Sequence, residues 1–391
     1  MVTTHNTPVT YQIIIPQLVR FGVGALNTLG VEIKKMRAQA VLIVTGPEVY
    51  RSGLVQPVSE QISKAMVSVD VFSKAEPEPT LHGLNKAASE LKRSKYDIIV
   101  GLGGGSSIDT AKGLSVLLAH GGEGQDYIGT DKIPGPGIAV IAIPTTAGTG
   151  SEVTNIAIFS DTVKELKAGM VSPYLLARVA LVDPALTYGC PRGVTAASGI
   201  DALVHVIECY TSTKANSFTD PIAVKAIQLI SSSLKTAVND GANKDARNAM
   251  AEGALLAGIA FGNSGVAAVH ALAYPLGARF HISHGVANGL LLPHVMECNL
   301  LANLNRYAFI AEVLGEPTQG LTQLQAARQG VKTIKTLIKD IGIPQRLRDL
   351  GVPREALEGM ALATMDVTRL LANNPKQLTL DDVRGIWQNA W

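Results

Sequence analysis

Cysteine is scarce in this sequence: Cys190, Cys209 and Cys298 are the only three among 391 residues. An odd number without paired spacing argues against a disulfide framework and fits a reducing cytoplasm. Charged residues make up only 17%, the net charge is +2 and no basic run occurs, which argues against a nucleic acid or an anionic membrane as partner. No apolar run approaches the length of a membrane span, and the first residues lack a signal-peptide pattern. We therefore expect a cytoplasmic protein that binds neither nucleic acid nor membrane.

What is present is typical of a compact α/β enzyme, with 47% hydrophobic residues and 38 glycines. Continuous apolar runs at 40–45, 67–72, 97–101, 137–143 and 178–182 predict buried parallel strands, and helical segments separate most of them. From about residue 194 the helical period takes over, at 195–211, 220–238, 245–261, 265–277 and 285–300. We predict a Rossmann-like dinucleotide-binding α/β domain over 1–193 and a helical metal-binding domain over 194–391, with the active site between them.

Four side chains in the second half predict one divalent-metal site. Asp201 and His205 are spaced i, i+4 in the apolar run GIDALVHVIE, so both project from one helix face about 6 Å apart along its axis. His270 follows in a helical run, and His284 precedes a glycine where the chain can turn back. One carboxylate and three imidazoles suit zinc or ferrous iron better than calcium or magnesium.

The alternative for each of these residues is structural. A single histidine in an apolar helix is more often a hydrogen-bonded core residue than a ligand, and a buried aspartate beside a histidine can be a structural pair. The metal site is favoured because His270, His281, His284 and His294 fall within 25 residues. We expect His281 and His294 to be the non-ligands of this group.

Two loops in the first half are rich in hydrogen-bond donors. GLGGGSSID joins a strand to a helix that we expect from Thr110, and PTTAGTGSE follows the strand at 137–143. Glycines let backbone amides approach a phosphate at a helix N-terminus, and ligands collect at strand carboxyl ends in such sheets. The glycines miss the G-x-G-x-x-G pattern, so a tight turn without a ligand stays an alternative, but two such loops favour a nucleotide.

These stretches, with VRFGVGAL near the start, VHALAYPLG and HGVANGLLLPHVM, resemble the iron-containing (group III) alcohol dehydrogenase family over nearly the whole chain. The resemblance implies the dehydroquinate synthase-like architecture, NAD or NADP as cofactor, and Fe2+ or, less often, Zn2+ bound by Asp201, His205, His270 and His284. The nucleotide-binding residues that it implies, with their neighbours in the same loops, are Gly46, Gly103, Gly104, Gly105, Ser106, Asp109, Thr145, Thr146, Thr149, Ser151 and Lys167.

Two positions depart from the family pattern. Tyr274 stands where many members carry a second histidine, and a phenol with a reference pKa near 10 is a poor proton shuttle at neutral pH. Gly46 stands where NAD-specific members carry an aspartate that would repel a 2′-phosphate, so we expect NADP to be tolerated. The nearby Glu76 and Glu78, and the lack of an arginine clamp, speak against a strong preference for it.

The predicted activity is hydride transfer between nicotinamide and a small primary alcohol or aldehyde, with Asp201, His205, His270, His284 and Tyr274 as the catalytic set. Three alternatives stay open: a hydroxyacid-oxoacid transhydrogenase, a dehydroquinate synthase-like lyase, and a non-catalytic descendant. We expect Phe159, Phe261 and Tyr274 to line the substrate pocket, with Ala260 and Gly262 as small neighbours. A homo-oligomer, a dimer or larger, is expected from the family.

Overall fold

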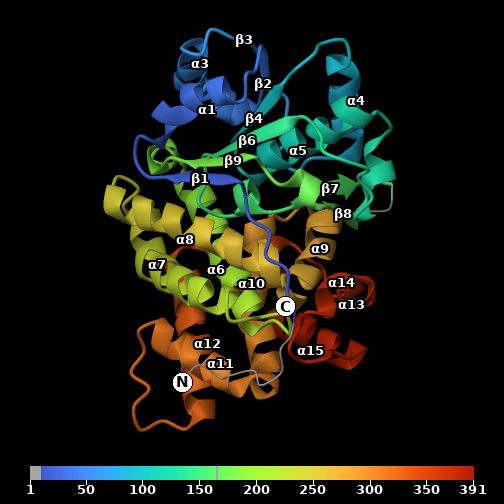
Figure 1. Ribbon diagram of the computed structural model, residues 1–391. Helices are drawn as coiled ribbons and strands as arrows, with labels where there is room; N and C mark the ends of the chain where they lie inside the picture. Colours follow the sequence, from blue (N-terminus) through green and yellow to red (C-terminus); the bar gives the residue numbers. More distant parts are fainter. Residues whose placement is uncertain (1–9, 164–165) are drawn as a thin grey trace.

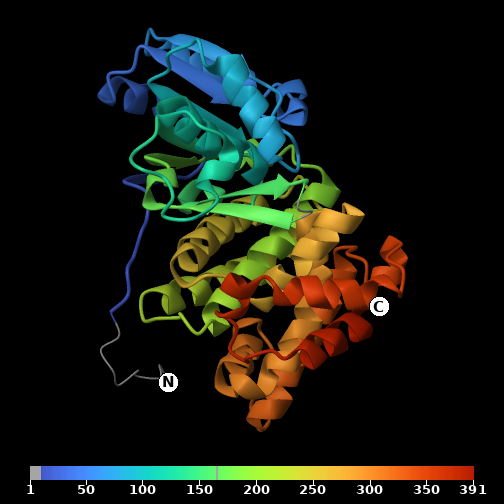
Figure 2. The same ribbon diagram turned by 90° about the vertical axis from the view of Figure 1, so that its right-hand side faces the viewer.

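The computed structural model describes residues 10–163 and 166–391. A parallel sheet with helices on both faces occupies one end of the molecule and a helical region the other (Figures 1 and 2). The six strands lie in the order β1-β9-β6-β4-β2-β3. Their bounds are β1 Leu18–Phe21, β2 Ala40–Val44, β3 Ser68–Phe72, β4 Ile98–Gly103, β6 Ala139–Pro144 and β9 Val179–Val182. This arrangement confirms the predicted fold class, and the five predicted strands are present.

Side-chain alternation between two covered faces explains why the inner strands β2, β4, β6 and β9 are apolar throughout. In β2, Val41 and Ile43 pack on one face of the sheet, and Leu42 and Val44 pack on the other. The first face is covered by α1 (Leu29–Lys35) and α3 (Val55–Ser63), and the second by α4 (Leu81–Leu91) and α5 (Gly105–His120). Every residue of β2 except the first, Ala40, is therefore buried.

A second, three-stranded sheet was missed by the sequence prediction. It has the order β5-β8-β7 and consists of β5 Gly129–Thr130, β8 Leu166–Val171 and β7 Ile156–Asp161, with β7 and β8 antiparallel. The arrows of β7 and β8 lie between the large sheet and the helices in Figure 2. This small sheet carries Lys167 and two isoleucines of the cavity described below.

The helical region is built around α6, which is buried over most of its length. The five predicted helices are confirmed, with ends that differ by up to three residues. The helices of this region are α6 Arg192–Thr211, α7 Thr219–Asn239, α8 Lys244–Ser264, α9 Ala268–Phe280, α10 His284–Asn299, α11 Leu304–Val313, α12 Gln323–Asp340, α13 Ala356–Met365, α14 Thr368–Leu371 and α15 Leu380–Ala390. One continuous apolar cluster joins them.

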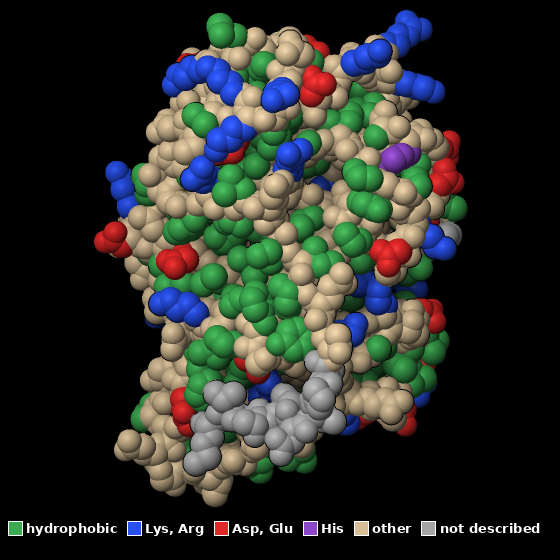
Figure 3. Space-filling view, in the orientation of Figure 1, with side chains coloured by type: hydrophobic (Ala, Val, Ile, Leu, Met, Phe, Trp, Pro, Cys, Tyr) green, Lys and Arg blue, Asp and Glu red, His purple; other side chains and the backbone are tan. Residues whose placement is uncertain are grey.

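The surface in Figure 3 carries dispersed charges of both signs, with Lys and Arg more frequent toward the end of the large sheet. Within the described residues, no single helix is long and apolar enough to cross a membrane. Taken together, α8 and α9 have the length and apolar composition of a membrane span, but the pair is bent by 103° at the break between the two helices.

Candidate metal centre

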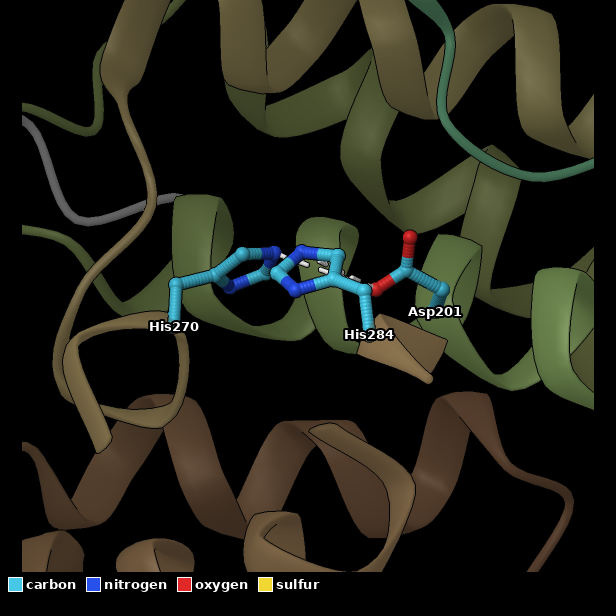
Figure 4. A group of neighbouring side chains, drawn as sticks. All are labelled: Asp201, His270 and His284. Atoms are coloured by element: carbon cyan, nitrogen blue, oxygen red, sulfur yellow. Dashed lines mark ion pairs between the residues drawn. The ribbon is translucent and has the colours of Figure 1, made fainter. Parts of the chain in front are cut away.

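Three helices bring the predicted ligands to one place. α6 presents Asp201 and His205 from one face, α9 contributes His270 from its first turn, and α10 begins at His284. In Figure 4 the rings of His270 and His284 point toward the carboxylate of Asp201. Asp201, His205 and His270 are buried, whereas the side chain of His284 is 33% exposed.

The distances suit a shared ion. Oδ1 of Asp201 lies 3.9 Å from Nε2 of His270 and 3.9 Å from Nε2 of His284. One ligand atom from each of the three residues falls within 4.8 Å of the others. Two ligands of a tetrahedral zinc with bonds of about 2.1 Å are separated by about 3.4 Å, so a contraction of roughly half an ångström would complete the coordination.

Asn288 shows that this centre is short of hydrogen-bond donors. Its Nδ2 lies 2.6 Å from Asp201 Oδ1, 3.2 Å from His270 Nε2 and 3.1 Å from His284 Nε2. An amide has two hydrogens, so it cannot satisfy three acceptors at once. A divalent cation at the centre would satisfy all of them, because each offers a lone pair. The donor set therefore fits a metal ion.

His205 is placed differently from the other two histidines. Its ring stacks between those of Phe261 and His270, at centroid distances of 4.2 and 4.6 Å. Its Nδ1 is buried without a hydrogen-bond partner and lies 3.9 Å from Oδ2 of Asp201. The structure thus converges three of the four predicted ligands, with the fourth beside them. Ligation by each of the four residues stays a prediction.

The electrostatics keep these groups in the forms that bind metal. Burial lowers the pKa of His205 to about 3 and also lowers the pKa of His284, so both imidazoles are neutral at neutral pH. Burial raises the pKa of Asp201, but the facing imidazoles and the Asn288 amide outweigh it, and the value lies below the ordinary one. The centre therefore presents one carboxylate and the neutral rings of His205 and His284.

Gly285 lets α10 approach α6 closely enough for this convergence. A Cβ at this position would lie 2.0 Å from the carbonyl oxygen of Ala197, a distance that no side chain tolerates. Any larger residue must push the start of α10 away from α6. Because His284 is the neighbouring residue, its position depends on this contact.

The metal centre forms part of the wall of a cavity of about 190 Å³ between the two regions. The predicted residues that line it are Asp201, His205, His270, His284, Tyr274, Phe261, Gly105, Ser106, Asp109, Thr149, Ser151 and Lys167. Phe159 was wrongly placed there by the prediction, because it is fully buried and packs near Leu84 and Gly113 beneath the sheet. Ala260 is also fully buried, and Gly262 faces Thr154.

The helix α5 begins at Gly105 and not at Thr110, so the Gly-Ser stretch forms the first turn of a 16-residue helix. Gly105 and Ser106, in its first turn, line the cavity, and the N-terminal end of a helix favours an anion. A Cβ on Gly105 would lie 2.8 Å from Thr149, and one on Gly104 would lie 3.4 Å from Thr146. The two donor-rich loops therefore meet, and the glycines make the contact possible.

The remaining nucleotide candidates lie at the carboxyl ends of the strands behind the cavity wall. Gly46 follows β2, Gly103 ends β4, and Thr145 follows β6 and donates its N–H to Gly103 O at 3.0 Å. Strand order reverses beside β2 and β4, which is the position where open α/β sheets bind ligands.

Several side chains that were predicted to contact the nucleotide form hydrogen bonds or ion pairs with other residues of the protein. The hydroxyl of Ser106 donates to Pro77 O at 2.5 Å, and Lys167 Nζ pairs with Glu78 and donates to Ser160 Oγ at 2.9 Å. Asp109 accepts from Ser151 Oγ at 2.5 Å and from the N–H of Ile158 at 2.9 Å. These bonds join α5 to the small sheet, so Asp109 shapes the cavity wall.

Tyr274 lies on α9 with its ring centroid 6.4 Å from that of His284. Burial raises the pKa of Tyr274, and the guanidinium of Arg369, which hydrogen-bonds the hydroxyl, opposes this only in part. The phenol stays protonated at neutral pH. It can therefore donate a hydrogen bond into the cavity but cannot shuttle protons by titration.

Sequence reasoning missed three polar residues of the centre. Glu208 is seven residues after Asp201 and Asn288 is four after His284, so helical spacing on the same faces was the available signal. Arg369 also lines the cavity, but no local pattern points to it.

Comparisons with known proteins agree with this geometry. Residues 16–184 match the family described as iron-containing alcohol dehydrogenase, and residues 195–391 match the C-terminal part of the Fe-containing alcohol dehydrogenase family. The chain belongs to the iron-containing alcohol dehydrogenase family.

Individual relatives extend over nearly the whole chain. Long-chain-alcohol dehydrogenase 1 of Geobacillus thermodenitrificans is 43% identical over 384 residues, covering 97% of this chain and 96% of its own. NAD-dependent methanol dehydrogenase of Bacillus methanolicus is 37% identical over 377 residues, covering 96% and 98%. A crystal structure of a 1,3-propanediol oxidoreductase has a TM-score of 0.95 at 37% identity, covering 98% of this chain and all of the other.

Proposed function

We propose that the protein is a metal-dependent, NAD(P)-linked alcohol dehydrogenase or aldehyde reductase acting on small primary alcohols or aldehydes. The observation that carries the proposal is the donor-poor cluster of Asp201, His270 and His284 in a cavity that also reaches the N-terminus of α5. A lone-pair cluster alone would suit many metal proteins. Here the cluster shares its cavity with a helix N-terminus, so a metal-bound substrate and the phosphates of a nicotinamide nucleotide could be held in the same site.

We propose Fe2+, with Zn2+ as the alternative, held by Asp201, His205, His270 and His284. An ion bound there would act as a Lewis acid on the oxygen of the alcohol or aldehyde. The four side chains hold their positions through neighbours: His270 through Glu208, His205 by stacking on Phe261, and both Asp201 and His284 through Asn288. Exclusion of water by this packing strengthens every electrostatic interaction in the site.

The α/β domain, residues 1–193, is proposed to bind NAD or NADP with its pyrophosphate at Gly104, Gly105 and Ser106. The glycines support this, since they let the loop with Thr146 and Thr149, a second source of hydrogen-bond donors, pack against the N-terminus of α5 at the cavity. Gly46 carries no charge that would repel a 2′-phosphate, so both cofactors are expected to bind. Residues 194–391 are the proposed metal-binding domain.

The substrate is proposed to lie in the cavity beside the metal ligands, with Phe261 in the cavity wall and Tyr274 donating a hydrogen bond. The 190 Å³ volume favours short substrates over bulky ones. The relatives named above include a long-chain-alcohol dehydrogenase and a methanol dehydrogenase, so the preferred length of the substrate's carbon chain must be measured.

A homo-oligomer is also proposed. Strand β1 lies at the open edge of the six-stranded sheet, and the neighbouring Phe21 and Val23 are 41% and 63% exposed. Light scattering after size exclusion would measure the mass.

We also propose a reducing cytoplasm as the location of the protein, on the basis of its three free cysteines.

The test of the proposed activity is a panel of short aldehydes with NADH and NADPH, followed at 340 nm with anaerobically purified, metal-loaded protein. Steady, metal-dependent oxidation of either nucleotide is expected. Bound metal without a net absorbance change would reject the proposal and favour the lyase. Turnover only when a hydroxyacid and an oxoacid are both present would favour the transhydrogenase.

A further inference from the structure

Glu208 joins two of the helices that form the metal centre. It lies on α6 two turns after Asp201, and it is only 4% exposed. Its Oε1 accepts the N–H of Val269 at 2.6 Å, and its Oε2 accepts the N–H of Ala267 at 3.0 Å. Both amides belong to the N-terminus of α9, whose first turn would otherwise leave them unpaired.

The same carboxylate oxygen also contacts a candidate ligand. Oε2 of Glu208 lies 2.6 Å from Nδ1 of His270. Since Oε2 and Oε1 already serve as acceptors, the hydrogen in this short contact belongs to Nδ1. The other ring nitrogen, Nε2, then carries a lone pair, and it faces Asp201 and the amide of Asn288.

We propose that Glu208 is a positioning residue for the metal, because it holds His270 in the tautomer whose Nε2 can bind an ion and fixes the start of α9 against α6. The inference rests on the proposed metal site. A carboxylate that accepts from a ligating imidazole orients the ring and makes its free nitrogen more basic. Glu208 acts through His270 and is not among the residues that line the cavity.

A purely structural role makes a different prediction. Capping of α9 alone affects the stability of the metal-free protein and leaves the strength of metal binding unchanged. Glu208→Gln keeps the size of the side chain but replaces one acceptor by an NH2 group and removes the charge. Positioning therefore predicts weaker metal binding in this variant, roughly 10-fold to 100-fold.

Glu32→Gln is a matched control. Glu32 is also 4% exposed and also accepts two hydrogen bonds, from Arg20 and Lys35, but it lies on α1 in the α/β region. The control makes the same isosteric change at the same degree of burial, and it is expected to leave metal affinity within twofold of the parent protein.

The experiment measures the Zn2+ dissociation constant of the full-length parent, Glu208→Gln and Glu32→Gln by competition with a chromophoric chelator. Metal bound equally tightly by all three would overturn the role of Glu208. No Zn2+ bound by the parent would instead overturn the proposed metal site. Nitrogen-15 NMR of histidine-labelled, metal-free parent protein provides a second test if Glu208→Gln does not fold. A hydrogen on Nδ1 of His270 is expected, and a hydrogen on Nε2 contradicts the inference.

Discussion

Replacing Asp201 by asparagine separates metal binding from folding. Asp201 is 2% exposed and is the only anionic member of the candidate ligand set. Asparagine keeps the shape of the side chain and an oxygen that can accept from Asn288, which now bonds Oδ1 at 2.6 Å. The metal-free variant is expected to fold, and its thermal midpoint provides the baseline for the metal-dependent gain.

The metal-dependent part of the stability should almost vanish. An ion present at about 1,000 times its dissociation constant stabilises the folded state by about 4 kcal/mol. With an unfolding entropy of about 2.1 cal/mol/K per residue, a chain of 391 residues then gains roughly 5 °C in thermal midpoint. Loss of the charged ligand should weaken binding at least about 100-fold, which leaves a gain of under about 2 °C.

The assay is calorimetry of both proteins with chelator and with excess Zn2+ or, anaerobically, Fe2+. Asp183→Asn is the matched control, since Asp183 is 4% exposed and bonds backbone amides of Gly24, Leu26 and Ala185 away from the centre. It should lower both midpoints and keep the metal-dependent gain. A full gain of about 5 °C in Asp201→Asn would refute the assignment of Asp201.

Three further predictions test the surroundings of the site. Gly285→Ala should weaken Zn2+ binding at least about tenfold and destabilise the fold by about 1–3 kcal/mol, because its Cβ meets a backbone oxygen at 2.0 Å. Chelator competition measures the binding and calorimetry measures the stability, with Gly193→Ala as the control because a Cβ at Gly193 points into open space. Unchanged Zn2+ binding in Gly285→Ala would contradict the packing argument. Burial raises the pKa of Glu152 from 4.5 to about 7, although a backbone hydrogen bond and Lys112 oppose this. The contribution of this carboxyl to stability is therefore full below pH 4.5 and falls by about 3 kcal/mol between pH 4.5 and pH 7. Urea titrations of Glu152→Gln should show a flatter profile over that window, and an unchanged slope would exclude the buried carboxyl as its source. Gly46→Asp should lower kcat/KM for NADPH relative to NADH roughly tenfold through charge repulsion, and equal ratios in variant and parent would show that the 2′-phosphate lies elsewhere.

The strands could be predicted because burial on both faces leaves a continuous apolar run, as in residues 40–45. The small sheet was missed because β7 and β8 mix polar with apolar residues, so their pairing depends on contacts that local pattern does not encode. Helix α5 was predicted to start too late, since its glycines and serines are poor helix formers in isolation.

For the site, spacing on one helix predicts that Asp201 and His205 share a face, and this is observed. Spacing does not predict that His205 stacks on Phe261, which is 56 residues away in the chain, because that contact depends on how α6 and α8 pack. Lys167 was expected near the nucleotide, and it does line the cavity, but its pairing with Glu78 depends on the fold of the small sheet.

The central claim is that turnover requires an ion at the cluster of Asp201, His270 and His284. The most direct measurement titrates metal-free protein with Fe2+ under anaerobic conditions while NADH or NADPH oxidation by a short aldehyde is followed at 340 nm. The rate should rise from the baseline and level off at one ion per chain. A full rate in metal-free protein, or no rate with one ion bound per chain, would contradict the account.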